Sequence, residues 1–78
     1  MEVSETAEFT IILEPTETGF SAYSPDVEGV YATGRTVEET ISEMRDAIAF
    51  HLAGLTDEEK AYHVHPSIVR RVRVPVGA

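Results

Sequence analysis

The chain has 78 residues, the size of one small domain, and its 14 acidic and 6 basic side chains give a formal net charge of −8. A domain this small buries only about 60% of the surface that its unfolded chain exposes, so we expect self-association to support its core. The absence of cysteine excludes disulfides and thiolate metal sites. The negative charge disfavours nucleic acid and favours a basic partner.

The charge is uneven along the chain. Every acidic residue lies within residues 1–59, whereas the tail from Lys60 onward carries Arg70, Arg71 and Arg73 and no acid. These arginines fit either a solvated strand face that discourages aggregation or a contact for phosphate or an acidic partner. No apolar run has the length of a signal sequence or a membrane span, so we expect one cytoplasmic domain over residues 1–78.

The N-terminal half is predicted to form three antiparallel strands. From Glu8 to Glu14 apolar and polar side chains alternate, which is typical of a strand with one face in the core. Ile12 lies on the polar face and indicates that this face is partly covered as well. In chain order, the expected segments are a frayed end over 1–7, a strand Glu8–Glu14, a turn Pro15–Gly19, a strand Phe20–Ser24, a connection Pro25–Gly29 and a strand Val30–Thr33.

An amphipathic helix is predicted to follow Thr36. Thr36 is a favourable N-cap, and Glu39 three residues later completes a capping-box pattern. Gly54 is expected to cap the C-terminus in the left-handed conformation. The apolar stripe of this helix contains Val37, Ile41, Met44, Ile48, Leu52 and Leu55.

The C-terminal part is predicted to add a helical turn and one more strand. Thr56 begins a second capping pattern, so a helical turn through about Tyr62 is expected. Valines and arginines then alternate from Ile68 to Val76, and Pro75 indicates an edge strand. The predicted fold is a two-layer α+β domain: a three-stranded antiparallel meander, one helix and a final edge strand, in the order β-β-β-α-β.

Several short motifs follow one another between Gly19 and Leu52. A Tyr23-Ser24-Pro25-Asp26 turn precedes Gly29, an Ala-Thr-Gly strand end closes at Gly34, and a Thr-Val-Glu-Glu helix start begins at Thr36. In this order and spacing the chain resembles the HicB family of antitoxins over roughly residues 8 to 75. The resemblance implies a truncated ribonuclease-H-like fold.

The resemblance also implies a partner. HicB antitoxins bind and mask HicA, a small basic toxin that cleaves messenger RNA. Many members carry a C-terminal DNA-binding segment; here the chain reaches Ala78 directly after the last expected strand, so no such domain and no direct DNA contact are expected. The acidic composition agrees independently with capture of a basic toxin.

The resemblance places the partner-binding surface around the turn after the second strand, where acids and an aromatic would meet a cationic RNA-binding face. The alternative is that this turn only shapes the fold. The expected contact residues are Tyr23, Ser24, Pro25, Asp26 and Glu28. A dimer or higher homo-oligomer is expected through the sheet or the last strand, with Ile12, Val72 and Val74 at its interface.

Catalytic and metal chemistry have no support in the sequence. His63 and His65 would point the same way in an extended segment, but nothing fixes a third ligand such as His51 beside them, so exposed loop histidines are the preferred interpretation. The opening strand lacks an interior carboxylate of the kind that holds magnesium in ribonuclease-H-type nucleases. No nucleophile or phosphate-loop motif occurs. We therefore expect no enzyme activity, no metal and no cofactor.

Two alternatives to a toxin-binding protein remain open. One is an orphan homo-oligomeric interaction protein of the same fold without a toxin. The other is a residual metal-dependent nuclease of the ribonuclease-H type.

Overall fold

A computed structural model describes residues 6–77. Three strands form one antiparallel sheet in the order β1-β2-β3, and two helices follow. The expected frayed end falls largely on residues 1–5, outside the described part of the chain. In chain order the elements are β1 (Ile12–Pro15), β2 (Phe20–Ser24), β3 (Val27–Gly34), α1 (Val37–Ala53) and α2 (Asp57–His63).

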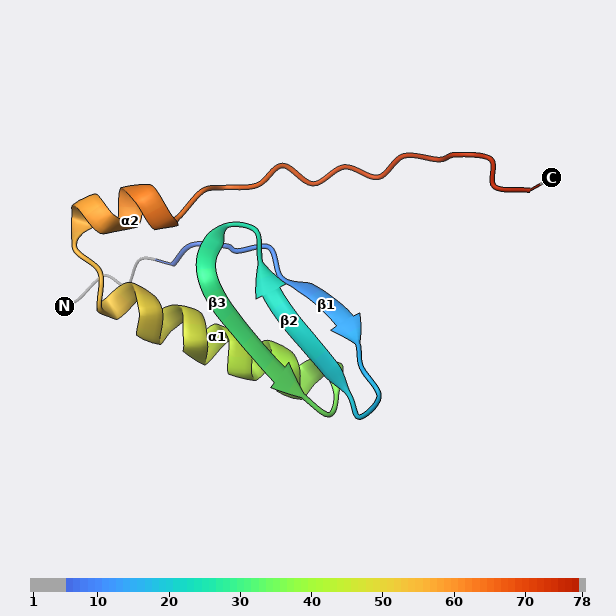
Figure 1. Ribbon diagram of the computed structural model, residues 1–78. Coiled ribbons are helices and arrows are strands. Elements are labelled where there is room, and N and C mark those ends of the chain that lie inside the picture. Colours follow the sequence, from blue (N-terminus) through green and yellow to red (C-terminus); the bar gives the residue numbers. More distant parts are fainter. Residues whose placement is uncertain (1–5, 78) are drawn as a thin grey trace.

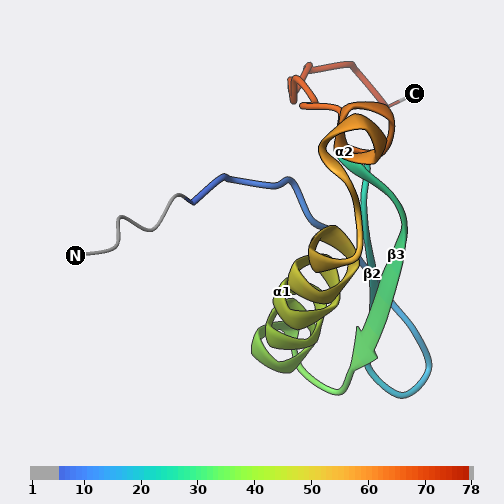
Figure 2. The same cartoon turned by 90° about the vertical axis from the view of Figure 1, so that its left-hand side faces the viewer.

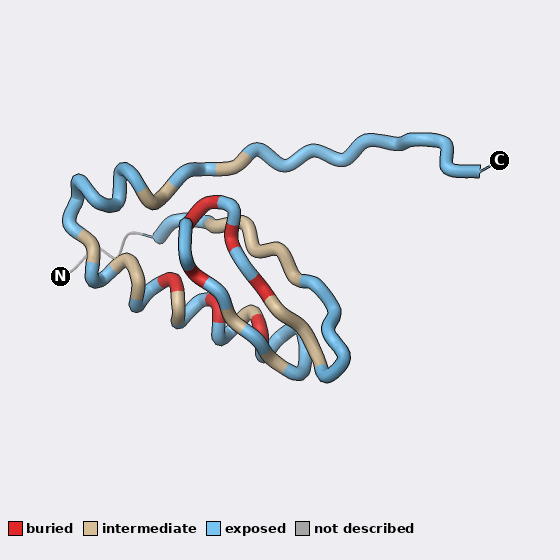
Figure 3. The backbone as a smooth tube through the Cα atoms, in the orientation of Figure 1, coloured by how far each residue is buried: buried red, intermediate tan, exposed pale blue. Residues whose placement is uncertain are grey.

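The sheet and α1 make two layers. Figure 2 shows α1 along one face of the sheet, while neither described helix lies over the opposite face. The core between the layers is small and consists of Ala22, Val27, Val30, Met44 and Ile48. Figure 3 shows in red the buried stretches of the sheet and of α1. Phe9, Ile11 and Leu13 pack against it from the N-terminal side, as their alternation predicts. The α+β class and the antiparallel meander are therefore confirmed.

β1 is shorter than its alternation predicts. It pairs with β2 from Ile12 opposite Tyr23 to Pro15 opposite Phe20. The same register would place Ile11 opposite Ser24, the last residue of β2, so the residues before Ile11 extend past the end of β2. Local alternation predicts an extended backbone but does not measure the length of the neighbouring strand.

β3 begins at Val27, three residues before its predicted start. Ser24 pairs with Val27, whereas Tyr23 pairs with Tyr31, so β3 contains extra residues in a bulge. Gly29 lies in this bulge with φ of 78°, a left-handed conformation that glycine adopts without strain. The expected loop is thus mostly part of the strand.

α1 has the predicted N-cap but a different C-cap. The Thr36 side chain accepts a hydrogen bond from the Glu39 N–H at 3.0 Å. Gly54 ends the helix with φ of −89°, so the predicted left-handed cap is wrong; its N–H donates to the carbonyls of His51 and Leu52 instead. Thr40 is fully buried, while Val37 is 39% exposed, so the buried stripe is rotated from the predicted one.

α2 confirms the second capping pattern. The Thr56 hydroxyl accepts from the Glu59 N–H, and the Glu59 carboxylate accepts from the Thr56 N–H, both at 3.1 Å. These bonds to its charged form hold the pKa of Glu59 below the usual range.

The predicted final strand is wrong in its pairing. Residues 68–76, the C-terminal arm, are extended but pair with no strand among the described residues. Figure 1 shows the arm leading away from the sheet beyond α2. Alternating valines and arginines specify an extended backbone, but they do not specify which edge receives it.

Candidate partner-binding face

The sheet presents one face that no described helix covers. The strand register brings Ile12, Tyr23 and Tyr31 into a single row across β1, β2 and β3. Their neighbours along the strands, Leu13, Ala22 and Ala32, point to the opposite face and pack on the core. We call Ile12, Tyr23 and Tyr31 the open-face row.

The open-face row is substantially accessible. Tyr31 is 74% exposed and Tyr23 is 39% exposed. The next row along the same face is polar, with Glu14, Ser21 and Thr33 opposite one another. Exposed aromatic residues bordered by polar groups are typical of protein-binding surfaces.

Asp26, in the turn between β2 and β3, is 4% exposed. Its carboxylate accepts hydrogen bonds from the backbone N–H groups of Thr10 and Ser67, both at 2.6 Å. Its backbone carbonyl accepts from the N–H of His65 at 2.6 Å. One residue thus fastens the N-terminal segment and the root of the C-terminal arm to the hairpin.

The charge of Asp26 is compensated by these donors. Desolvation by burial acts to raise its pKa, but the hydrogen bonds from Ser67 and Thr10 outweigh it and hold the pKa of Asp26 below the usual value. The carboxylate is therefore ionised at neutral pH and fully engaged inside the molecule.

The five predicted contact residues divide by exposure. Ser24 is 6% exposed, and its hydroxyl accepts from the Asp26 N–H at 3.1 Å, so Ser24 and Asp26 shape the turn. Tyr23, Pro25 and Glu28 are exposed. Sequence reasoning missed Tyr31, although it alternates with apolar residues in the third predicted strand, as an outward-facing residue should.

The histidines meet in an arrangement that the sequence did not predict. His51 of α1 and His63 of α2 lie edge to face with ring centroids 6.1 Å apart. His63 Nδ1 lies 3.7 Å from a carboxylate oxygen of Glu28, while the His51 Nε2 atom is buried without a hydrogen-bond partner. Within residues 6–77 no group of three or more His, Cys, Asp or Glu side chains is arranged to hold a metal ion.

The predicted oligomer residues lie in two places. Ile12 is part of the open-face row, whereas Val72 and Val74 lie on the arm, 82% and 66% exposed. Arg70, Arg71 and Arg73 are exposed on the same arm. Neither helix of the described chain has the length and apolarity needed to cross a bilayer.

Comparison with known proteins gives a family and one distant relative. No solved structure matches the chain. An uncharacterized 14.9 kDa protein from the rep-hol intergenic region of Haemophilus phage HP1 (strain HP1c1) is 29% identical over 52 residues, which is 67% of this chain and 39% of that protein. The family described as "HicB_like antitoxin of bacterial toxin-antitoxin system" matches residues 9–75. The chain therefore belongs to the HicB-like antitoxins of bacterial toxin–antitoxin systems.

Proposed function

We propose that this chain is an antitoxin domain that captures a small basic toxin of the HicA type and blocks its messenger-RNA-cleaving surface. Membership of the family implies a toxin partner in general and a regulatory rather than an enzymatic role. The identity of the toxin and the surface that binds it are the additional parts of the proposal.

The observation that carries the proposal is the open-face row. An exposed tyrosine presents a large, rigid apolar ring with one polar group, and such residues dominate the energetics of protein interfaces. Tyr31 and Tyr23 are opposite one another on neighbouring strands, so their side chains leave the sheet on the same face. On the opposite face of the sheet, α1 packs against β2 and β3 and supports the surface that carries the tyrosines.

Charge selects the class of partner. The chain carries a net charge of −8. Glu28, beside the turn that ends β2, has a side chain that is 67% exposed, and Glu14 lies in the polar row next to the tyrosines. A cationic RNA-binding face would find complementary charge around an aromatic centre, so association should be fast and sensitive to salt.

The test begins with a tagged pull-down from the native host at low salt, followed by mass spectrometry. We expect a stoichiometric small basic protein that is released by high salt. Self-association without any partner at any salt would instead favour an orphan interaction protein.

The surface is tested with two tyrosine variants. Tyr31→Ala should weaken toxin binding by about tenfold or more, the loss that is typical for truncation of a central interface tyrosine. Tyr62→Ala, at a residue of α2 that is 77% exposed, is the matched control and should bind like the parent chain. Equal affinities for the parent and Tyr31→Ala would exclude the open-face row as the toxin-binding surface.

A further inference from the structure

The C-terminal arm exposes apolar side chains that a strand would normally bury. Val72, Val74 and Val76 are 82%, 66% and 95% exposed. Figure 1 shows the arm extended beyond the body of its own chain, and Figure 3 shows it exposed throughout. An extended segment that pairs with no strand among residues 6–77, with valines on one side, is a template for pairing with another chain.

The root of the arm is fixed. Val64 bridges to Val27, the N–H of His65 donates to the carbonyl of Asp26, and the N–H of Ser67 donates to the Asp26 carboxylate. These contacts set the direction in which the following residues leave the body. The arm therefore leaves the body of its own chain and does not return along its own sheet.

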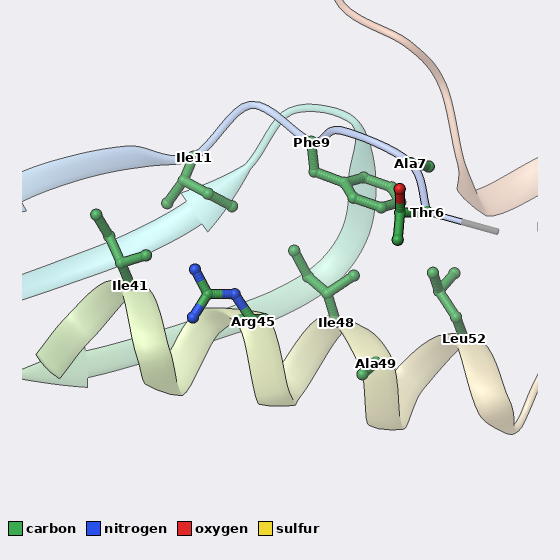
Figure 4. A pocket seen from close by; sticks show the side chains of 9 residues that line it. All are labelled: Thr6, Ala7, Phe9, Ile11, Ile41, Arg45, Ile48, Ala49 and Leu52. Atoms are coloured by element: carbon green, nitrogen blue, oxygen red, sulfur yellow. The ribbon is translucent and has the colours of Figure 1, made fainter. Parts of the chain in front are cut away.

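A complementary groove lies next to residues 6–11, the segment that leads into β1, and β1 is an edge strand of the sheet. Figure 4 shows this groove between the segment that leads into β1 and α1. Its volume is about 530 Å³, and its lining is mostly apolar. The side chains that line it from opposite sides include Phe9, Ile11, Ile41, Ile48 and Leu52.

The pattern of the arm fits the edge and the groove together. A strand added beside residues 7–15 would place alternate side chains toward α1 and the others toward the open face. Val72, Val74 and Val76 share one parity and would enter the groove. Pro75 lacks an N–H, but it has the other parity. Its backbone therefore faces the opposite edge of the arm, and the edge formed by Val72, Val74 and Val76 keeps all the N–H groups that it needs to pair.

Charge identifies the occupant. The arm carries Arg70, Arg71 and Arg73 without any acid, whereas all 14 acids of the chain lie within residues 1–59. Glu8 and Glu14 flank the free edge, on the side that Arg71 and Arg73 would face. A second copy of this chain therefore supplies both the strand that the edge lacks and the charge that it favours.

We propose that the arm of one copy adds as a fourth strand along the β1 edge of a second copy, and that the exchange is reciprocal. Two such contacts related by a two-fold axis close a dimer. The final edge strand that the alternation predicts is then present in the assembly, but it comes from the partner copy. This inference does not depend on toxin capture, because it uses the β1 edge and the groove rather than the open-face tyrosines.

The first test is the solution mass of the full chain by sedimentation equilibrium. The parent chain should reach twice the 8.6 kDa of one copy. Val72→Asn and Val74→Asn should each raise the dimer dissociation constant by about a hundredfold, since a buried valine is worth roughly tenfold and occurs twice in the dimer. Val69→Asn, of the opposite parity on the same arm, is the matched control and should change the constant little.

Circular dichroism separates loss of association from loss of folding. Val72 and Val74 contribute nothing to the core of their own chain. The spectra of both variants should therefore match that of the parent chain diluted until it is monomeric. A parent chain that stays monomeric, or a dimer indifferent to Val72→Asn and Val74→Asn, would overturn the proposal.

Disulfide trapping distinguishes exchange between copies from folding back within one copy. The chain has no cysteine, so single-cysteine variants are clean probes. A tagged chain with Ile12→Cys or Glu14→Cys is mixed with an untagged chain with Arg71→Cys or Arg73→Cys. Exchange predicts a mixed disulfide for at least one pair and none with the control Phe50→Cys on α1. A chain that carries both Glu14→Cys and Arg73→Cys is tested alongside. A disulfide within this chain, with no disulfide between any of the single-cysteine chains, would overturn the proposal.

Discussion

Replacing Asp26 by asparagine tests whether this buried carboxylate fastens the two ends of the domain. The change keeps the size of the side chain but leaves one oxygen in place of two. The parent carboxylate accepts from the N–H of Thr10 and from the N–H of Ser67, both at 2.6 Å. In the variant, one of these N–H groups must face an amide NH₂ and loses its acceptor.

The expected loss is large for a domain of this size. A hydrogen bond to a charged group contributes about 1.5–3 kcal/mol, and the abandoned buried N–H adds its own desolvation penalty. We therefore expect Asp26→Asn to lower the free energy of unfolding by about 3 kcal/mol. A 78-residue domain has roughly 4–12 kcal/mol in total, so the variant should approach the limit of folding.

Urea unfolding followed by circular dichroism measures this loss, and its pH dependence identifies the carboxylate. The folded-state pKa of Asp26 lies below its ordinary value of 3.8. The contribution of the Asp26 carboxylate to the free energy of unfolding is therefore complete above its unfolded-state pKa. It disappears as the pH falls through its folded-state pKa. The stability difference between the parent and Asp26→Asn should be constant at neutral pH and shrink below about pH 4.

Asp46→Asn, at an exposed position of α1, is the matched control and should change stability by less than about 0.5 kcal/mol. Amide hydrogen exchange adds a local signal, because the Thr10 and Ser67 amides should lose protection in Asp26→Asn. Equal urea midpoints for the parent and Asp26→Asn at neutral pH would refute the fastening role.

Three further variants test the packing of the helices. Gly34→Ala should cost about 2 kcal/mol in urea unfolding, because its Cβ would lie 2.8 Å from a backbone nitrogen of α1, whereas Gly77→Ala meets no atom and should be neutral. Met44→Ala should lower the free energy of unfolding by about 2–5 kcal/mol, because Met44 is fully buried. Phe50→Ala, at a residue of the same helix that is 84% exposed, should lower it hardly at all. Similar losses for both variants would contradict the assignment of Met44 to the core. Thr56→Ala should cost about 1 kcal/mol and weaken the amide protection of α2, and unchanged protection would refute its capping role.

The elements that sequence predicts well are set by local chemistry. The Thr36 cap and the reciprocal bonds of Thr56 and Glu59 join residues three apart, so their residue types and spacing carry all the information needed. The alternation of Phe9, Ile11 and Leu13 likewise identifies the face that packs on the core. The class of fold follows from these signals.

The elements that sequence predicts poorly depend on distant partners. The sequence predicts that Asp26 is an exposed acidic residue in a turn. Its carboxylate instead accepts hydrogen bonds from the N–H groups of Thr10 and Ser67, which lie 16 and 41 residues away along the chain. The helix stripe shifts toward Thr40 because Gly34 lets α1 approach β3 closely. The arm shows the same limit, since its alternation predicts a strand without identifying a neighbour.

For the candidate site, the sequence identifies the correct segment of the chain but not which of its residues are exposed. Tyr23 and Glu28 are exposed as expected, whereas Ser24 and Asp26 are buried. Tyr31 joins Tyr23 only through the register of β2 and β3, which a bulge at Gly29 shifts. A local motif cannot reveal such a cross-strand pair until the register is known.

Inhibition of the toxin tests the central claim most directly. The basic protein recovered in the pull-down is assayed for messenger-RNA cleavage while the parent chain, Tyr31→Ala or Tyr62→Ala is titrated in. We predict that the parent and Tyr62→Ala stop cleavage near equal molar ratios, and that Tyr31→Ala requires about tenfold more protein. Cleavage that continues at saturating parent chain, or that Tyr31→Ala stops as efficiently as the parent, would contradict the account.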